Sequence, residues 1–260
     1  MSHPKPVDPA PPYYGSLPLI QSSTIRICTI ALSGTDKIRL IGTPDPLTPL
    51  LRSAILSTWG TIQRECNFAG SHEFKLSGTP WDGQGPDTVR SRRLLSGMLF
   101  TMARAGWNLL QATDVRKREN HKDTLFFEYK ETPGGVETLH EVELFAVSFH
   151  KSDRIRIISQ QHPQEAVRMM ELVKQAVMAQ WKYGIQDEQD YCGALEIKLQ
   201  GNPWSSRGDE SVYAKVMLAQ MIANFRAEGF KLYGCIGIGE GHDGNDIESW
   251  VLRRVNASWS

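Results

Sequence analysis

Two segments of the chain place a carboxylate and an ammonium group at the same spacing. Glu73 and Lys75 stand in SHEFKLSGTPW, and Glu196 and Lys198 stand in ALEIKLQGNPW. In an extended strand, residues two positions apart point to the same face, so each Glu lies on the same face as its Lys. Such a pair, lining a cleft, is a candidate catalytic site that occurs twice. The alternative interpretation is a structural cross-strand ion pair on a solvated sheet face.

His72 directly precedes the first pair, and Leu195 replaces it in the second. A catalytic role confined to one half of the chain would use His72, and a plain surface histidine is the alternative. The seven histidines show no HxxxH or HExxH spacing, and there is no GxSxG elbow or P-loop. We therefore expect no metal site and no cofactor. The four cysteines form no CxxC pair, and we expect them to be reduced core residues.

A second group of chemically capable residues is basic and belongs to the first half of the chain. The candidates for binding an anionic ligand are Arg90, Arg92, Arg93, Arg116, Lys117 and Arg118. A basic surface there predicts an acidic partner, a phosphorylated ligand, an anionic membrane or RNA, and the alternative is a solvated helix face and hairpin. Because Lys+Arg and Asp+Glu balance at 29 each, nucleic acid is an unlikely partner.

The N-terminal segment contains a third kind of motif. Pro11-Pro12-Tyr13-Tyr14 fits the PPxY pattern within a proline-rich tail that we expect to be disordered. Such segments favour the polyproline II conformation, which docks in the aromatic groove of WW domains. Pro11, Pro12 and Tyr14 are therefore the predicted partner-binding residues.

The elements that position these residues occur twice in the sequence. Trp81 and Trp204 are 123 positions apart, and the same offset relates many other pairs on both sides of them. The structural anchors of the repeat are Gly78, Gly201, Pro80, Pro203, Trp81 and Trp204. This pattern predicts an internal tandem duplication with two pseudo-symmetric halves. The expected organisation is a tail over 1–22, a first repeat over 23–140 and a second repeat over 141–260.

Each half predicts an α+β fold with the unit β-β-α-β-α-β-β. Two β-rich segments come first, and a helix follows over about 47–64 or 163–183. The strand with the Glu and Lys residues leads through the Gly-x-Pro-Trp turn into a second helix, which Gly106 or Gly229 ends as a C′ residue. A closing hairpin completes the unit. We expect the two units to form a closed pair that shares one sheet or sits as separate lobes.

The composition limits the class of protein. The 260 residues are 40% hydrophobic and 22% charged, which is typical of a globular chain. We see no signal peptide and no apolar run of 18 residues, so the expected location is the cytoplasm. The leading hypothesis is a non-enzymatic binding or adaptor protein with a PPxY tail. The alternatives are an enzyme or small-ligand-binding protein with its site between the repeats, and a protein that binds anionic lipid or RNA through its basic first repeat.

Overall fold

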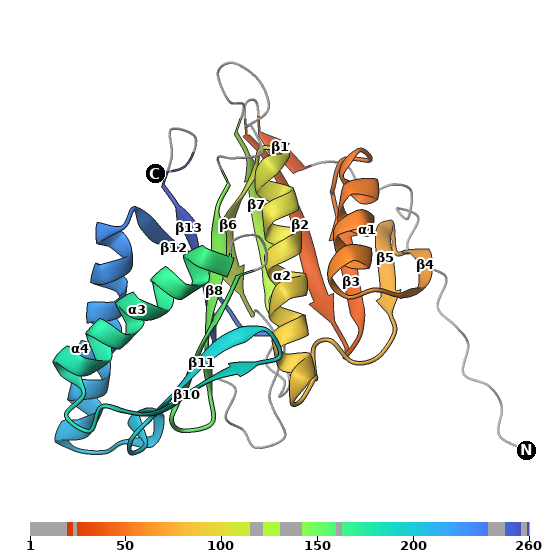
Figure 1. Cartoon of the computed structure of the whole chain (residues 1–260). Helices are drawn as coiled ribbons and strands as arrows, with labels where there is room; N and C mark the ends of the chain where they lie inside the picture. The colour runs from red at the N-terminus through yellow and green to blue at the C-terminus, as the bar shows by residue number, and fades with distance from the viewer. Residues whose placement is uncertain are drawn as a thin grey trace, which may run out of the picture.

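The computed structural model describes residues 20–22, 25–114, 122–130, 142–159, 163–238, 248–255 and 259. It contains two α+β units with the same order of elements, here called repeat 1 and repeat 2 (Figure 1). A short strand β1 (Ile20–Ser22) precedes repeat 1, which consists of β2 (Ile25–Ser33), β3 (Lys37–Ile41), α1 (Leu47–Thr58), β4 (Ile62–Phe68), β5 (Ser71–Leu76), α2 (Pro86–Arg104), β6 (Trp107–Thr113) and β7 (Thr124–Tyr129). Repeat 2 consists of β8 (Leu144–His150), β9 (Arg154–Ile158), α3 (Pro163–Gln180), β10 (Ile185–Tyr191), β11 (Ala194–Leu199), the 3-10 turn η1 (Pro203–Ser205), α4 (Asp209–Ala227), β12 (Phe230–Ile236) and β13 (Ser249–Arg254). The predicted α+β duplication is confirmed.

Each repeat has one strand more than the sequence predicted. The first helices end at Thr58 and Gln180 instead of near 64 and 183, and strands β4 and β10 follow them. Both are edge strands of their sheets, and most of their side chains are exposed. The apolar alternation that reveals a half-buried strand is therefore missing, and polar residues are expected on an edge.

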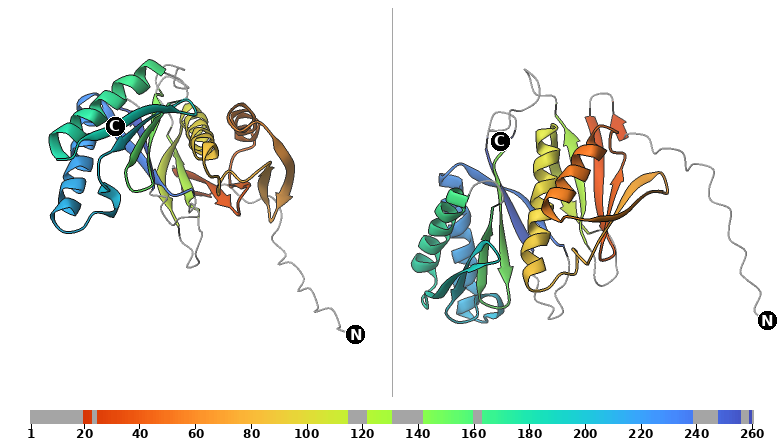
Figure 2. Two further views of the ribbon diagram at one scale, coloured as in Figure 1. Left: turned by 60° about the horizontal axis from the view of Figure 1, so that its bottom comes forward. Right: turned by 45° about the vertical axis from the view of Figure 1, so that its right-hand side comes forward.

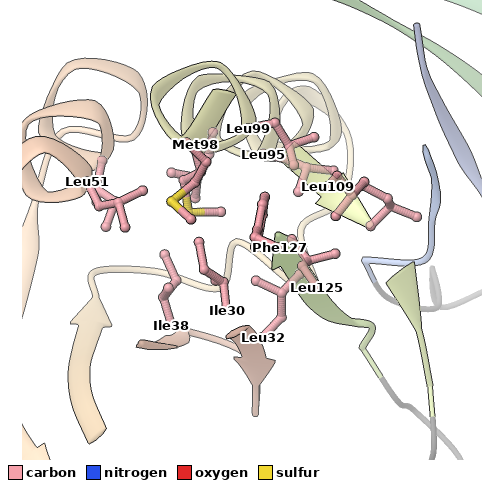
Figure 3. Close-up of a cluster of buried hydrophobic side chains, with 14 of the residues drawn as sticks. Ile30, Leu32, Ile38, Leu51, Leu95, Met98, Leu99, Leu109, Leu125 and Phe127 are labelled. Carbon is pink, nitrogen blue, oxygen red and sulfur yellow. The ribbon is translucent and has the colours of Figure 1, made fainter. Parts of the chain in front are cut away.

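The two sheets have the same strand order. The order is β4-β5-β3-β2-β7-β6 in repeat 1 and β10-β11-β9-β8-β13-β12 in repeat 2, with all neighbours antiparallel. In repeat 1, α1 and α2 lie side by side on one face of the sheet. Figure 3 shows the side chains between these layers, with Leu95, Met98 and Leu99 of α2 above Ile30 of β2 and Phe127 of β7. All five are essentially inaccessible to solvent. This apolar layer fixes where the helices lie over the sheet.

The Gly-x-Pro-Trp turns lock each helix pair to its sheet. Trp81 is 1% exposed, and its Nε1 donates to the carbonyl of Lys37 at 2.9 Å. Trp204 is half-buried and donates to the carbonyl of Arg154 at 3.4 Å. The turn also contains Gly78 (φ 77°) and Gly201 (φ 82°), conformations that disfavour a side chain, together with Pro80 and Pro203. The predicted anchors thus hold the chain between a strand and the following helix.

The repeats pack against each other through unlike surfaces. Helix α2 contacts its own sheet and also the outer face of the repeat 2 sheet, whose other face is covered by α3 and α4 (Figure 1). Figure 2 shows α2 between the two sheets from two further directions. The edge strands β6 and β12 also meet, because the backbone N–H of Leu109 donates to the hydroxyl of Tyr233 at 2.7 Å. Each repeat therefore has its own sheet. The arrangement with one shared sheet, which the sequence left open, does not occur.

Three sequence expectations concern smaller features. Gly106 and Gly229 follow α2 and α4 directly, with φ of 81° and 84°, which confirms them as C′ residues. The expectation of four core cysteines is correct only for Cys28, which is buried. Cys66 and Cys235 are half-buried, and Cys192 is exposed. No helix within the described ranges is long and apolar enough to cross a bilayer.

Candidate binding groove in the first repeat

In repeat 1 the two residues of the predicted Glu–Lys pair have different partners. Glu73 is 1% exposed and accepts a hydrogen bond from Nε of Arg39 at 2.7 Å, on the neighbouring strand β3. Its other oxygen lies 3.6 Å from the guanidinium of Arg64. Lys75 extends instead toward Asp36, at 3.8 Å. Glu73 is thus the buried acceptor of a guanidinium cluster, and it does not pair with Lys75.

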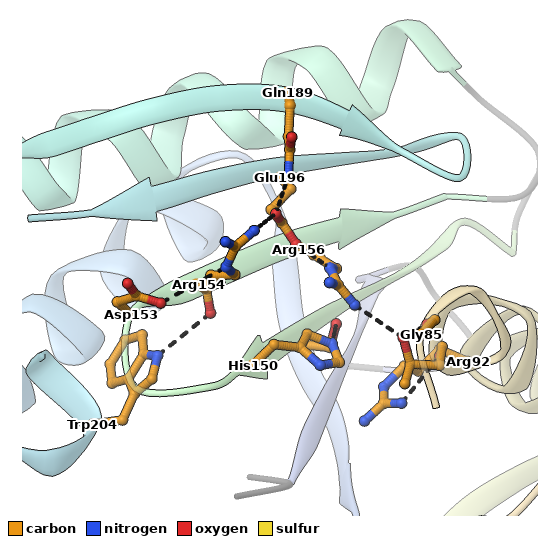
Figure 4. Close-up of polar contacts among 11 residues, drawn as sticks. Gly85, Arg92, His150, Asp153, Arg154, Arg156, Gln189, Glu196 and Trp204 are labelled. Carbon is orange, nitrogen blue, oxygen red and sulfur yellow. Dashed lines mark hydrogen bonds and ion pairs between the residues drawn. The ribbon is translucent and has the colours of Figure 1, made fainter. Parts of the chain in front are cut away.

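Repeat 2 repeats this arrangement with more donors. Glu196 accepts hydrogen bonds from Arg154, Arg156 and the Gln189 amide (Figure 4). Burial acts to raise the pKa of Glu196, but the hydrogen bonds from Gln189 and Arg156 lower it below its ordinary value. Lys198 lies 3.9 Å from Asp153. The carboxylate is therefore held ionised by fixed cations, which is the pattern of a structural ion-pair network.

His72 belongs to an ion-pair network at the surface of repeat 1. Its Nε2 lies 3.0 Å from Oε2 of Glu65. Arg52 donates one hydrogen bond to each oxygen of the same carboxylate, at 2.8 Å to Oε1 and 2.7 Å to Oε2. The hydrogen bond from Arg52 is the main cause that lowers the pKa of Glu65. These contacts tie strands β4 and β5 to helix α1. Among the described residues, no group of three His, Cys, Asp or Glu side chains is placed to hold a metal ion.

The three predicted basic residues that the structure describes, Arg90, Arg92 and Arg93, do not form one open surface. Arg90 pairs with Asp87 at 2.9 Å and donates to the carbonyl of Trp59 at 3.0 Å. Arg92 is 2% exposed and donates to Oγ of Ser249 in repeat 2, and Arg93 donates to the carbonyl of Gly193. Two of the three arginines therefore help to join the repeats. The remaining candidates lie outside the described residues, as does the predicted boundary between the repeats at residues 140 and 141; these candidates are Arg116, Lys117, Arg118, Pro11, Pro12 and Tyr14.

A groove between the two helices of repeat 1 was not predicted. A groove of about 830 Å³, open to solvent, runs between helices α1 and α2 of repeat 1. Its walls come from α1 and α2, and its floor comes from the end of the sheet. The lining residues are Arg26, Pro44, Pro46, Leu47, Leu50, Ser53, Ala54, Ser57, Thr58, Gly97, Phe100, Thr101, Arg104, Ala105, Trp107 and Tyr129. The lining is mainly apolar, and its described residues include no Asp or Glu.

Two arginines give the groove a positively charged end. The guanidinium of Arg26 lies 3.6 Å from the ring centre of Tyr129, which packs against Trp107 on the sheet. Arg104, at the end of α2, stacks over Phe100 at 5.5 Å. Its Nε is buried and has no hydrogen-bond partner among the residues that the structure describes. Within the described part of the chain, neither Arg26 nor Arg104 has a carboxylate partner, so both charges face the groove uncompensated.

Repeat 2 fills the equivalent space with amide side chains. Gln220 takes the place of Gly97, Asn224 that of Thr101 and Gln180 that of Thr58. Gln180 donates to Gln220 at 3.5 Å, and Gln220 donates to Asn224 at 2.8 Å. Asn224 in turn donates to the carbonyl of Leu172 on α3 at 2.9 Å. The helices α3 and α4 are thereby bridged where α1 and α2 leave a groove.

The charged end of the groove also differs in repeat 2. Arg254 takes the register position of Tyr129 and stacks over Phe230 at 4.4 Å. Two carboxylates neutralise it, Glu143 at 2.5 Å and Glu165 at 3.2 Å.

A single sequence signal could have revealed the groove of repeat 1. Gly97 stands in the middle of a helix, where glycine costs about 1 kcal/mol, and its counterpart is a good helix former.

Comparison with known proteins identifies the repeated unit. One protein-family model matches the chain twice, over residues 26–128 and 143–253, and the description of that family names a domain without an activity, ligand or partner. The two matches cover most of the chain, so the protein belongs to this domain family and carries two tandem copies of the domain. No match was found among the curated proteins or among the solved structures.

Proposed function

We propose that the protein is a non-catalytic binding protein whose repeat 1 groove takes an apolar ligand with one anionic end, such as a long-chain carboxylate. The observation that carries this proposal is the apolar groove that ends at Arg26 and Arg104, two arginines with no carboxylate partner among the described residues. Its volume of about 830 Å³ suits a small organic molecule, because such sites commonly measure roughly 300–1,000 Å³.

The charge of the ligand follows from the state of the two arginines. A buried donor without a partner, such as Nε of Arg104, costs about 1–3 kcal/mol. A carboxylate at this end would accept from Arg104 and would also neutralise Arg26. Hydrogen bonds between charged partners are about twice as strong as neutral ones, so the anionic end should orient the ligand.

The lining supports binding more than catalysis. The described residues around the groove include no Asp, Glu, His, Lys or Cys side chain. The hydroxyls of Ser53, Ser57, Thr58 and Thr101 donate to carbonyls of their own helices at 2.7–3.0 Å. No described residue of the lining is a base that could activate them as nucleophiles, so this lining can hold and orient a ligand without reacting with it.

Calorimetric titration of the full chain with laurate tests the proposal. We expect saturable binding at one site, and we expect methyl laurate, which has no charge, to bind at least about tenfold more weakly, equivalent to 1.4 kcal/mol. Arg104→Gln should weaken laurate binding to a similar degree. Arg226→Gln, at an exposed position in the last turn of α4, is the matched control and should bind normally. Equal affinity for laurate and its ester would exclude an anion-recognising site.

A second binding function is proposed for the N-terminal segment. The PPxY motif of Pro11, Pro12 and Tyr14 supports recruitment of a WW-domain partner. A fluorescence-polarisation titration with an isolated WW domain that recognises PPxY peptides should give binding that Tyr14→Ala abolishes. The neighbouring Tyr13→Ala is the control, since the pattern leaves that position free. Unchanged binding by the Tyr14 variant would contradict the proposal.

A further inference from the structure

The first helices of the two repeats differ in length at their N-terminal ends. Helix α1 has 12 residues and α3 has 18, and each ends directly before a tryptophan, Trp59 or Trp181. The additional residues of α3 (18 − 12 = 6) are therefore at its start. The first turn of α3 contains Glu165, whereas the first turn of α1 contains no acidic residue. Repeat 2 thus has a carboxylate at a place where repeat 1 has none.

In repeat 2 this carboxylate is bound to a stacked guanidinium. Glu165 lies 3.2 Å from Nη2 of Arg254, whose guanidinium lies 4.4 Å from the ring centre of Phe230. The backbone N–H of Arg254 donates to the carbonyl of Glu143, just before strand β8, at 3.0 Å. The Glu143 carboxylate also accepts a hydrogen bond from the Arg254 side chain. Two carboxylates of repeat 2 itself thus neutralise this arginine.

Repeat 1 keeps a stacked guanidinium but lacks both carboxylates. The register of β2 and β7 pairs Ile27 with Glu128, which places Arg26 beside Tyr129. The guanidinium of Arg26 lies 3.6 Å from the ring centre of Tyr129. Arg26 stands 117 positions before Glu143, the offset that relates the opening strands of the repeats. The arginine is thus on the other strand of the pair, and the glutamate is missing.

We infer that the anionic group of the repeat 1 ligand takes the place that the Glu165 carboxylate takes in repeat 2, against Arg26 at the first turn of α1. This inference rests on the function proposed above and specifies how the ligand lies in its groove. The Glu165 side chain is a carboxylate on methylene groups, so the internal group has the chemistry of an alkyl carboxylate. The N-terminus of α1 adds a partial positive charge that no first-turn acid offsets. Repeat 2 fills the equivalent place with its own carboxylates, so we expect one ligand per chain.

This position of the anionic group sets the direction of the alkyl chain. Arg104 and Gly97 both line the groove, two turns apart on α2, or about 10 Å along the helix axis. A chain that starts at Arg26, beside Arg104, therefore runs between the helices toward Gly97. The chain of octanoate, with C–C bonds of about 1.5 Å, ends at or before Gly97, whereas the longer chain of laurate extends past it.

Pro46→Glu in the full chain tests the position of the anionic group. Pro46 is exposed, lines the groove and has helical backbone angles (φ −61°, ψ −20°), so a glutamate is accommodated there without strain. Its carboxylate would pair with Arg26 as Glu165 pairs with Arg254. Pro46→Gln has the same shape without the charge and is the matched variant. By calorimetric titration, Pro46→Glu should bind laurate at least about tenfold more weakly than Pro46→Gln.

This inference and the function on which it rests fail in different ways. A wild type that binds no laurate would overturn both. If the wild type binds laurate and the two Pro46 variants bind it equally, the groove function stands and the position of the anionic group is wrong. Thermal unfolding supplies a readout without ligand. Pro46→Glu should melt no lower than Pro46→Gln, and a lower midpoint would overturn the pairing with Arg26.

Gly97→Gln, titrated with two chain lengths, tests the direction of the alkyl chain. The new side chain obstructs the far part of the groove, which laurate reaches and octanoate does not. The affinity for laurate should therefore fall at least about tenfold more than the affinity for octanoate. An equal loss for both would place the anionic group at the Gly97 end of the groove and overturn the inference.

Discussion

The helix pairs of the two repeats share one fold and differ in what lies between the helices. Gly97, Thr101 and Thr58 leave an open groove in repeat 1, whereas Gln220, Asn224 and Gln180 bridge the helices in repeat 2. The sheets and turns below them are alike. The comparison teaches that one helical layer can serve as a binding surface or as a structural cover, depending on a few side chains that leave the backbone order unchanged.

The largest expected effect concerns the buried ion pairs that both repeats contain. Glu196→Gln leaves Arg154 and Arg156 without their carboxylate, and loss of one partner of a buried pair costs about 3–5 kcal/mol. Glu73→Gln should cost less, because the side chains of Arg39 and Arg64 are 20% and 59% exposed and can be hydrated, whereas that of Arg156 is only 6% exposed. Urea unfolding of both variants measures the difference. Glu188 forms an ion pair with Lys174, and its carboxylate is exposed. The control Glu188→Gln should therefore change the free energy of unfolding by less than about 1 kcal/mol. A larger loss from Glu73→Gln would reverse the comparison.

The next largest difference between the repeats should be in how they contribute to the pH dependence of the free energy of unfolding. His150 in repeat 2 is buried, and burial together with Arg92, Arg156 and Arg154 lowers its pKa to about 2. The unfolded chain therefore takes up a proton near pH 6.5 that the folded chain refuses. Stability from this group is complete above pH 6.5 and falls by roughly 1.4 kcal/mol per pH unit below it.

His150→Asn tests this dependence, because the amide can still form a hydrogen bond with Ser148 and does not titrate. We expect urea unfolding of the variant to lose the slope between pH 6.5 and 4.5, the range above the ordinary pKa of the carboxyl groups. Repeat 1 has Ser33 at the equivalent strand position, so no second histidine contributes there. An unchanged slope in the variant would assign the acid sensitivity to another group.

Exchanging the residues at the groove should convert one repeat toward the other. Gly97→Gln is expected to abolish laurate binding while stabilising the helix by up to about 1 kcal/mol. Gln220→Gly should destabilise the chain by about 1–2 kcal/mol, from helix propensity and a lost hydrogen bond. Titration and urea unfolding of both variants measure these changes. Laurate binding that survives Gly97→Gln would place the ligand elsewhere.

The smallest expected effect concerns the arginines at the sheet end. Arg26→Gln removes a cation stacked on Tyr129 with no ion pair in the described part of the chain, so the loss of stability should be below about 1 kcal/mol. Arg254→Gln leaves Glu143 and Glu165 without their shared cation and should cost more. Thermal unfolding of the two variants side by side measures the contrast. Equal losses would mean that Arg26 is as firmly held as Arg254 and is not reserved for a ligand.

The sequence was sufficient for the parts of the fold that repeat and bury apolar groups. The spacing of Trp81 and Trp204 predicted the duplication, and Gly106 and Gly229 predicted two helix ends. The edge strands β4 and β10 were missed, because exposure on an edge leaves no apolar alternation to detect. The alternation of apolar and polar residues marks a strand only where one of its faces is buried, and most side chains of β4 and β10 are exposed.

The site was harder to predict for a physical reason. Glu73 and Lys75 were placed on one face of a strand, but the neighbouring strand puts Arg39 opposite Glu73, and register between distant strands cannot be deduced from local spacing. The groove forms where small side chains leave space between α1 and α2. In the sequence, its clearest sign is Gly97, at the position where repeat 2 has the larger residue Gln220. The basic residues of α2 were identified, but not that two of them would bond to repeat 2.

The position of α2 between two sheets has a consequence for how the molecule unfolds. One hydrophobic core contains residues of both repeats, including Leu94 of α2 and Val251 of β13. If repeat 2 melted alone, it would expose part of this core and the buried guanidinium of Arg92 to water. The two domain copies therefore form a single cooperative unit, in which calorimetry should record one heat-absorption peak. Neither copy is therefore an independent building block.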